Sequence, residues 1–536
     1  MRKVLNFLDR LLPWRMVFLS AIALCITIYP LILSISAIGL LVHWLLEEGL
    51  LEKWENLKQR KSLWVFCSIL LIHIIGLSYS EDFNSGFNDI IKKLPIVSLP
   101  LILGTIPALN PKQFKILLHF FLLGIVISSI ICAVNYFFNN SITNVREISI
   151  FISHIRYSLL INLGIFVSLF FVFSNYYSTT AKEKIIFSFV AFWFVVFLFI
   201  LKAFTGIIIF FLLSFIWLIV FTLRMKNGRL KYLLFLLHFS FFSFGIVFFL
   251  LNILNFYKTD ETVFVNPEPF TINGNPYEHI PELQYLENGN YVWMYVCKDE
   301  LRSLWQKRSS LNFDSTDLKG QKLSYTVIRY LTSVGLRKDS VGLASLSDSE
   351  IRNIEKGYAN CRYVDNNSLS NRFYGIIWEI DIFLKGGNSS GHSLTQRFEY
   401  LKTAIYIIKE NPLWGVGTGD VKIAFKQMYE KTNSKLELQF RRTSHNQYIT
   451  FILTFGIPLG LCLIFALFFP AILEKKKRNV LLYTFLIIAL VSMLNEDTLE
   501  TQIGATFFGY FFALFLYAAP EGLGVFFGKN MVKVIE

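Results

Sequence analysis

Long apolar blocks separated by short polar and charged stretches are the dominant pattern along the chain. Most blocks are about 17–25 residues long, which is the length of a helix that crosses the ~30 Å hydrocarbon core of a bilayer. The pattern predicts about twelve membrane-spanning helices, at 17–30, 32–46, 63–79, 94–107, 115–137, 157–175, 185–201, 204–222, 232–256, 447–470, 480–495 and 504–519.

The first apolar block runs from residue 17 to residue 46 and has Pro30 near its middle. As one helix it would be about 45 Å long at 1.5 Å per residue, which exceeds a single upright crossing. Proline also breaks the hydrogen-bond ladder in the interior of a helix. Basic residues flank both ends of the block, so we expect two short spans rather than one.

Composition excludes several soluble domains of the same total length. Of the 536 residues, 54 % are hydrophobic and 17 % are charged, whereas ordinary soluble chains have about 25 % charged residues. Too few polar side chains remain to cover a water-facing surface of this size. The spans and the composition together predict an all-α polytopic membrane protein.

The net charge is +13, and its distribution predicts the orientation of the chain. Alternate loops of the predicted topology carry 22 Lys and Arg residues on one side, against five in the short loops on the other side. Loops rich in Lys and Arg stay in the cytoplasm, so we expect both termini to be cytoplasmic. This asymmetry explains the excess of positive charge better than a nucleic-acid partner does.

A polar insert, residues 257–446, interrupts this rhythm before the third-last predicted span and lies on the outer side of the predicted topology. It separates an N-terminal membrane domain, 1–256, from a C-terminal membrane domain, 447–536. No fold is predicted for 258–370. Apolar residues at helical spacing predict three helices in the rest of the insert, at 372–384, 394–410 and 421–432.

The clearest candidate for chemistry is Arg441-Arg442-Thr443-Ser444-His445-Asn446, where the insert returns to the membrane. An imidazole titrates near neutral pH and can accept a proton, and a guanidinium binds phosphate oxygens through paired hydrogen bonds. Together these groups suit a lipid-linked phosphate at the membrane surface. The alternative is that the basic side chains snorkel to the interface and that His445 caps the next helix.

Three other basic residues are predicted near the same face of the membrane. Arg397 lies in the first turn of the helix at 394–410, and His154 and Arg156 lie at the outer end of the sixth span. Charged groups near a bilayer are costly and are often functional. Each arginine can equally be an anchor at the lipid head groups, so both interpretations stay open.

Acidic residues cluster at the outer end of the last predicted hairpin. Glu496, Asp497 and Glu500 can pair with the arginines, but we expect them to face water. The remaining histidines are scattered, and the six cysteines lack the spacing of a zinc site. No metal site is therefore predicted.

A glycine-rich stretch with Gly415, Gly417 and Gly419 precedes Asp420 and a predicted helix. Such stretches cradle nucleotide phosphates when they follow a buried strand and end in Gly-Lys-Ser or Gly-Lys-Thr. Neither feature is present, so we expect a tight turn between two helices.

Only two cysteines, Cys297 and Cys361, fall in the insert, and the other four fall in predicted spans. The outer compartment permits oxidation, so a Cys297–Cys361 disulfide is expected. In the chain-entropy account such a bond would add roughly 4 kcal/mol to the free energy of unfolding. The alternative is a pair of buried free thiols.

These motifs resemble those of the O-antigen ligase family. The resemblance rests on 444–447 before a span with Gly456 and Gly460, on Gln396-Arg397, and on the glycine-rich stretch 411–420. The order of the spans is similar too, with one large outer loop before the third-last helix. Residues 153–158 are similar to a segment of Bacteroidetes-type members.

The resemblance implies a fold like that of GT-C glycosyltransferases in a bacterial inner membrane, with a periplasmic loop. It implies transfer of a glycan from undecaprenyl diphosphate to an acceptor hydroxyl, which for the ligase belongs to lipid A-core. O-antigen polymerases and protein O-oligosaccharyltransferases share the donor and stay as alternatives. No cofactor, metal or nucleotide is implied, because the diphosphate leaving group activates the donor. A flippase or transporter is an alternative of another class, although transporters favour polar groups and broken helices near the bilayer midplane.

Given this resemblance, we expect His445 to be the central catalytic residue, which activates the acceptor hydroxyl. Its alternative role is to bind the diphosphate. Asn446 is expected to orient the imidazole or a substrate oxygen, or else to cap the tenth span. His154 and the three glycines Gly415, Gly417 and Gly419 are expected to support the site. The expected ligands of the donor diphosphate are Arg156, Arg397, and Arg441 or Arg442.

Overall fold

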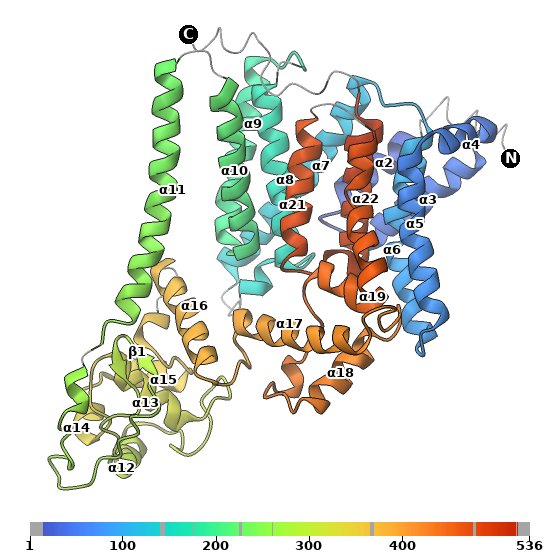
Figure 1. Ribbon diagram of the computed structural model, residues 1–536. Coiled ribbons are helices and arrows are strands. Elements are labelled where there is room, and N and C mark those ends of the chain that lie inside the picture. The colour runs from blue at the N-terminus through green and yellow to red at the C-terminus, as the bar shows by residue number, and fades with distance from the viewer. Residues whose placement is uncertain are drawn as a thin grey trace. The chain divides into compact units, whose positions relative to one another are not determined.

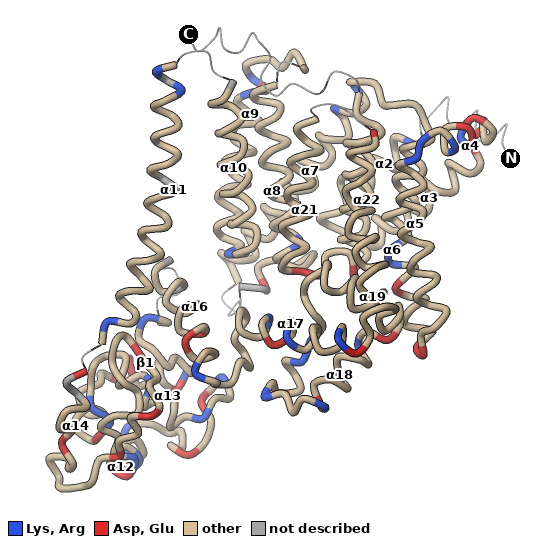
Figure 2. Tube along the Cα trace, viewed as in Figure 1, with Lys and Arg blue, Asp and Glu red and all other residues tan. Residues whose placement is uncertain are grey.

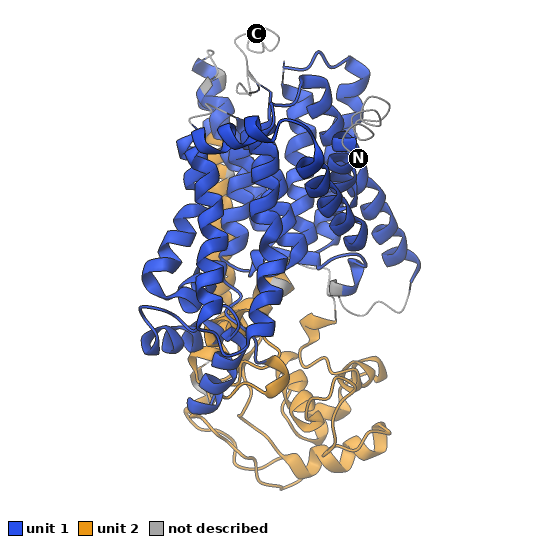
Figure 3. Ribbon diagram, turned by 90° about the vertical axis from the view of Figure 1, so that its right-hand side faces the viewer, with its two compact units in different colours: residues 1–235, 400–434, 441–536 blue, residues 236–399, 435–440 orange. Residues whose placement is uncertain are grey.

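The computed structural model describes residues 14–139, 145–174, 176–224, 228–259, 261–364, 369–474, 479–520 and 523. Several basic residues that predict the orientation, including the loop 475–478 and those near both termini, lie outside the described residues. Contacts divide the chain into two compact units, shown in Figure 3. Unit 1 comprises 1–235, 400–434 and 441–536, and unit 2 comprises 236–399 and 435–440.

Unit 1 is a bundle of helices (Figure 1). Its N-terminal part contains α2 (Trp14–Cys25), α3 (Pro30–Leu46), α4 (Leu50–Gln59), α5 (Lys61–Ser78), α6 (Phe83–Thr105), α7 (Pro111–Phe138), η1 (Val145–Ile148), α8 (His154–Phe173), α9 (Ala181–Ile200), α10 (Phe204–Arg224) and the start of α11 (Gly228–Phe256). Its C-terminal part contains most of α17 (Ser393–Glu410), α18 (Val421–Lys431), α19 (Gln447–Ala466), α20 (Phe469–Leu473), α21 (Val480–Met493), η5 (Thr498–Glu500), α22 (Gln502–Ala513) and η6 (Leu514–Ala518).

Each of the twelve predicted spans overlaps one of these helices, and the all-α polytopic class is confirmed. In the described part of the chain, seven helices are long and apolar enough to cross a membrane: α5, α7, α8, α9, α10, α11 and α19. The pair α3 and α4, bent by 105°, would be an eighth if it counts as one span. Shorter apolar helices are α2, α21 and α22 with η6. In Figure 2 the charged residues of unit 1 gather at the helix ends.

Two helix starts follow directly from the sequence. Pro30 occupies the first position of α3, where its missing N–H removes no intrahelical bond. The predicted break between the first two spans is therefore present. Helix α6 begins earlier than the predicted span at 94, because the Asp82 side chain accepts a hydrogen bond from Ser85 N at 2.9 Å and caps the helix.

Helix α22 lies in the core of unit 1 and is buried along most of its length. The ring of Phe485 on α21 contacts the rings of Phe507, Phe508, Phe511 and Phe512 on this helix. Helix α6 also approaches α22 closely, since a Cβ atom on Gly509 would lie 2.3 Å from Pro95 O. Small residues permit such approaches between helices in a membrane, where close packing stabilises association.

Unit 2 contains the rest of α11 and the first residues of α17, with one small sheet. Its other elements are η2 (Glu261–Phe264), β1 (Leu286–Glu287), β2 (Asn290–Tyr291), α12 (Lys298–Arg308), α13 (Leu323–Ser333), α14 (Ser340–Ala344), α15 (Asp348–Glu355), η3 (Cys361–Tyr363), α16 (Leu369–Leu384) and η4 (Leu438–Phe440). Strands β1 and β2 are antiparallel, and Leu286 pairs with Tyr291. Asn288 and Gly289 form the turn with φ of 51° and 85°, as Asn-Gly does in tight hairpins.

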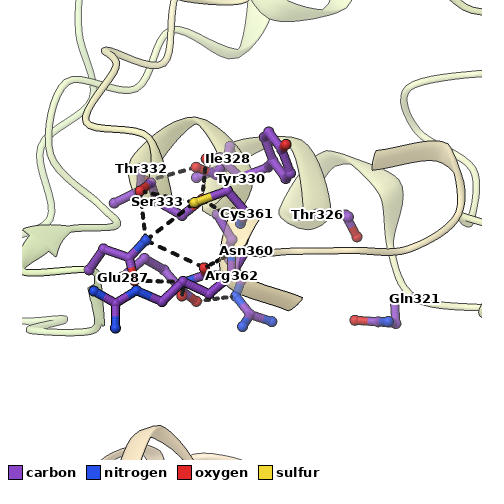
Figure 4. A network of polar contacts seen from close by, with 12 residues as sticks. Glu287, Gln321, Thr326, Ile328, Tyr330, Thr332, Ser333, Asn360, Cys361 and Arg362 are labelled. Atoms are coloured by element: carbon purple, nitrogen blue, oxygen red, sulfur yellow. Dashed lines mark hydrogen bonds and ion pairs between the residues drawn. The ribbon is translucent and has the colours of Figure 1, made fainter. Parts of the chain in front are cut away.

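An ion pair between Glu287 and Arg329 organises unit 2 around this hairpin, and Figure 4 shows Glu287 and Asn360 of its network. Glu287 is fully buried and accepts hydrogen bonds from Arg329 Nε at 2.7 Å and from Asn360 Nδ2 at 2.6 Å. Burial raises the pKa of Glu287, and Arg329 opposes that shift. The Arg329 guanidinium also lies 4.3 Å from the centre of the Trp378 ring. The pair joins Arg329 of α13 to Glu287 of the hairpin. Removing either residue would leave a buried charge without its partner, which is strongly destabilising.

The predicted Cys297–Cys361 disulfide is wrong, since both cysteines are free. Cys297 precedes α12, and its amide donates to Lys338 O at 2.8 Å. Cys361 lies beside α13, where its thiol contacts Ser333 O at 3.6 Å (Figure 4). The two thiols belong to different local networks, so the alternative of two free thiols holds. Denatured, unreduced protein should accordingly expose both thiols to a labelling reagent.

We expect the stability of the insert to rise with pH because of Lys338. This side chain is buried, and its Nζ donates to Tyr291 O at 3.2 Å. Burial lowers the pKa of Lys338 to about 7, with partial opposition from Asp339. Between about pH 7 and pH 10 the unfolded chain keeps a proton that the folded chain loses, so the free energy of unfolding rises by up to about 1.4 kcal/mol per pH unit.

Lys338→Met should remove this slope and raise stability at neutral pH, because no ammonium group then has to be buried. Urea unfolding of the full chain in detergent, followed by proteolysis of the insert, measures the effect. Lys356→Met, at an exposed position on the same unit, is the control. An unchanged slope in Lys338→Met would assign the pH dependence to another group.

Candidate functional site

The segment that carries His445 is a short loop fixed at the start of α19. Asn446 caps this helix: its side chain accepts from Ile449 N at 3.1 Å. The Asn446 amide also donates to Leu494 O at 2.9 Å. His445 itself has a φ of 48°, which is uncommon for a residue with a side chain and is typical of functional loops. Of the two roles considered for Asn446, the structure has the cap.

Asp497 holds this loop through hydrogen bonds to its side-chain carboxylate. Its carboxylate accepts hydrogen bonds from His445 N at 3.1 Å and Thr450 Oγ1 at 2.7 Å, and from Thr443 Oγ1 and Ser444 Oγ at 3.3 Å each. Asp497 is buried, and burial raises its pKa. We expected the acidic residues of this turn to face water, and for Asp497 that is wrong. These four hydrogen bonds to one carboxylate hold the loop that carries His445 in place.

The imidazole of His445 is partly enclosed, with about one third of its side chain exposed. Its Nδ1 lies 3.9 Å from Oε2 of Glu496 and makes no hydrogen bond to any described residue. The ring of Tyr400 lies 5.5 Å away, between centroids. Glu496 is buried as well, so it does not face water either. Glu496 is therefore near Nδ1 of His445 but does not accept a hydrogen bond from it.

The two arginines before this loop are held by α18. The Arg441 guanidinium lies 5.6 Å from the centre of the Tyr429 ring and donates to Ser434 O at 3.3 Å. Arg442 is exposed, and its carbonyl accepts from Tyr429 Oη at 2.8 Å. These contacts fix residues 441 and 442, which precede His445 by four and three positions.

The other predicted basic residues belong to other helices. His154 and Arg156 form the first turn of α8, where Arg156 is half-buried and its Nε makes no hydrogen bond to a described residue. Among the described residues, no hydrogen bond or ring contact joins Arg156 to His445. Arg397 belongs to unit 2, where it donates to the Ser393 carbonyl and hydroxyl at 3.2 Å each. The convergence of these arginines on one diphosphate stays a prediction.

The glycine-rich stretch docks into a break in α19. The helix is non-helical at Gly456, which has a φ of 76°, and Pro458 has no N–H to offer the Thr454 carbonyl. Gly417 N instead donates to Thr454 O at 2.9 Å, and Val416 N donates to Leu453 O at 3.0 Å. In exchange, Ile457 N donates to Pro412 O at 2.8 Å. The turn predicted from the sequence is present, and its backbone completes the hydrogen bonds of the broken helix.

The stretch also reaches α5 and α6. Thr418 N donates to Gly76 O at 3.2 Å, and Gly419 N donates to Ser80 Oγ at 3.0 Å. The Asp420 carboxylate accepts from the amides of Glu81 and Asp82 at 2.8 Å each. Gly415, Gly417 and Gly419 therefore serve the architecture of the site.

We expect Gly415→Ala to lower the yield and stability of folded protein. Gly415 has a φ of 67°, and an added Cβ atom would lie 2.4 Å from the Thr454 carbonyl. Gly391→Ala is the matched control, because Gly391 has a φ of 84° with nothing within 4 Å. That control should lose only the strain of about 1–2 kcal/mol. Thermal unfolding in detergent compares the two variants, and equal losses would mean that backbone strain alone explains both.

A second charged cluster joins α6 to the turn at 497–500. Lys93 of α6 is buried and forms ion pairs with Asp89 and with Glu500, at 2.7 Å from the Glu500 carboxylate. Gln447 donates to Glu500 at 2.8 Å and accepts from Leu499 N at 2.8 Å. Burial raises the pKa of Glu500, but Lys93 outweighs that effect and keeps the carboxyl ionised.

The sequence singles out Glu496 and Asp497 only as residues expected to face water, and it does not predict their positions beside His445 or the ion pairs of Lys93. One signal was available, because ionisable residues near a bilayer usually pair with each other. The partners lie far apart in the sequence, so composition alone gives no reason to match them.

The fold is that of a polytopic helical membrane protein. His445 lies just before the span α19, and Asp497 holds its backbone. Residues 364–464 match the O-antigen ligase family. The matched segment contains Arg397, the glycine-rich stretch, His445 and most of α19. This match covers 101 of the 536 residues and agrees with the resemblance to the O-antigen ligase family that the motifs indicate. No curated protein matches the chain.

Proposed function

We propose that this protein is a glycosyltransferase of the bacterial inner membrane. It moves a glycan from undecaprenyl diphosphate to an acceptor hydroxyl at the periplasmic face, with lipid A-core as the acceptor. The observation that carries the proposal is the His445 loop, which lies within the family match and is held by Asp497 with Glu496 beside its imidazole. Orientation, donor and acceptor are part of the proposal.

In the proposed reaction the acceptor oxygen attacks the anomeric carbon of the donor glycan. The bond between that carbon and the diphosphate oxygen breaks, and undecaprenyl diphosphate leaves. The acceptor proton passes to Nε2 of His445, since Glu496 lies next to Nδ1. A positioned base typically contributes 10²–10⁴-fold to such a step. The leaving diphosphate already makes the donor reactive.

The arginines are proposed as donor ligands, since a diphosphate carries about two negative charges and pairs well with guanidinium groups. Arg441 and Arg442 flank the loop, and Arg156 and Arg397 are further candidates. Arg397→Lys should raise the donor KM nearly as much as Arg397→Ala, because lysine lacks the bidentate fork. Arg352→Lys, at an exposed position in the insert, is the control. Unchanged donor affinity in Arg397→Ala would remove Arg397 from the site.

Reconstitution of the purified protein with a lipid-linked glycan tests the proposal. Three acceptors are supplied separately: lipid A-core, a second lipid-linked glycan and an acceptor protein. We expect glycan on lipid A-core. Product on one of the others would instead assign a polymerase or a protein glycosyltransferase. Movement of the lipid-linked glycan across the bilayer with no product would assign a flippase.

A further inference from the structure

A cavity of about 340 Å³ lies in unit 1 next to the His445 loop. It is bounded by α5, α6, the glycine-rich stretch, the start of α18, α19 and the turn at 497–500. Thr443 and Asp497 line it, and both belong to the hydrogen-bond network that holds His445. The volume falls in the range of small-molecule sites, about 300–1,000 Å³.

The floor of the cavity is aromatic and buried. The rings of Phe451 and Phe455 lie against His73 of α5, with ring centroids 6.2 Å and 4.7 Å from the imidazole. Thr418 and Thr454 complete the buried part with hydroxyl groups. Such a floor combines apolar faces with a few hydrogen-bonding groups.

The mouth of the cavity is polar and exposed. Ser85, Asn88 and Lys92 line it from α6, and Lys422 lines it from α18. Hydroxyl and amide groups can donate and accept hydrogen bonds, and ammonium groups donate them in several directions. A ligand with many hydroxyl groups would find partners around its whole edge.

The charges of the lining residues balance. Lys92, Lys93 and Lys422 face Asp89, Asp497 and Glu500. Lys93 is already neutralised by its ion pairs with Asp89 and Glu500, and the carboxylates repel an anion at short range. A diphosphate therefore gains little here, whereas a neutral polyhydroxylated ring fits both the floor and the mouth.

We propose that this cavity is a subsite for a neutral pyranose ring of one of the two glycan substrates. The ring packs on Phe451 and Phe455 and hydrogen-bonds to Asn88 and Ser85 at the mouth. The inference rests on the proposed function, because only a glycosyltransferase brings such a ring to His445. The cavity is distinct from the arginine ligands proposed for the diphosphate.

The test uses Asn88→Trp, which fills the mouth of the cavity from an exposed position on α6. Asn84→Trp is the matched control, because Asn84 is exposed one turn earlier on the same helix and does not line the cavity. Ser85→Trp fills the mouth from a second position if Asn88→Trp does not fold. Steady-state transfer is measured with lipid A-core and lipid-linked glycan varied separately.

We expect Asn88→Trp to raise the KM of one glycan substrate by roughly tenfold or more, as the loss of a few hydrogen bonds and a stacking contact predicts. The substrate that responds identifies which glycan occupies the cavity. Unchanged KM values for both substrates would overturn the inference, and so would weaker binding of undecaprenyl diphosphate without a glycan.

A direct measurement separates this inference from the proposed function. Binding of detached core oligosaccharide and of detached donor glycan to the full-length protein in detergent is followed by saturation-transfer NMR. Binding of either glycan that Asn88→Trp abolishes and Asn84→Trp keeps supports the subsite, even if no transfer is observed. Transfer activity with no such effect of Asn88→Trp rejects the subsite while the proposed function stands.

Discussion

Replacing His445 with alanine should abolish glycan transfer and leave donor binding intact. The imidazole is proposed to take the acceptor proton, and loss of a positioned base lowers the rate by about 10²–10⁴-fold. The loop itself should survive, because Asp497 binds the backbone N–H of residue 445 rather than the side chain. Single-turnover transfer and binding of lipid-linked glycan, measured on the same protein preparation, provide the two readouts.

His279→Ala is the control for this experiment, since His279 is a half-buried histidine of the insert with no part in the proposed reaction. It should transfer glycan at the wild-type rate. Loss of donor binding in His445→Ala would favour the alternative role as a diphosphate ligand. Wild-type turnover in folded, membrane-inserted His445→Ala would reject both roles.

Asp497→Ala should lower both stability and activity. The Ser444 and Thr450 hydroxyls lie 2.6 Å apart and can bond each other, but the N–H of His445 would lose its acceptor. A buried donor left unsatisfied costs about 1–3 kcal/mol. Because the loop then relaxes, we expect kcat to fall at least tenfold while the donor KM changes little.

Asp497→Asn is the informative partner variant. It keeps the volume, but one of the two carboxylate oxygens becomes an NH₂ group that cannot accept, so one of the two pairs of donors around Asp497 loses its acceptor and kcat should fall as well. Asp348→Ala, at a surface carboxylate that pairs with Arg308, should cost less than about 1 kcal/mol. If Asp497→Ala kept the wild-type kcat, Asp497 would not position the loop.

The spans could be predicted because a bilayer imposes one length and one polarity on every crossing. The helix ends could be predicted where a local rule sets them: Pro30 begins α3, and α17 ends at Glu410, before Asn411-Pro412. The predicted helix at 421–432 likewise appears as Val421–Lys431. In each case the deciding residues are neighbours in the sequence.

The supports of the site could not be predicted, because their partners are remote. Lys93 and Glu500 are 407 positions apart, and Asp497 reaches His445 across 52 positions. The disulfide failed for a related reason: counting cysteines identifies candidates, but only the fold decides whether two thiols meet. His445 could be selected from its residue type and its neighbours, whereas the carboxylates that hold it could not.

The break in α19 has a consequence for how the protein is made. The carbonyls of Leu453 and Thr454 receive their hydrogen bonds from residues 416 and 417, which leave the ribosome before the helix does. A backbone group without a partner in lipid costs several kcal/mol. A C-terminal fragment that begins at residue 447 would lack both donors, and Pro458 could not replace the one that Thr454 loses. In the full chain residues 416 and 417 are synthesised before α19. Their N–H groups are therefore already available when this helix enters the bilayer.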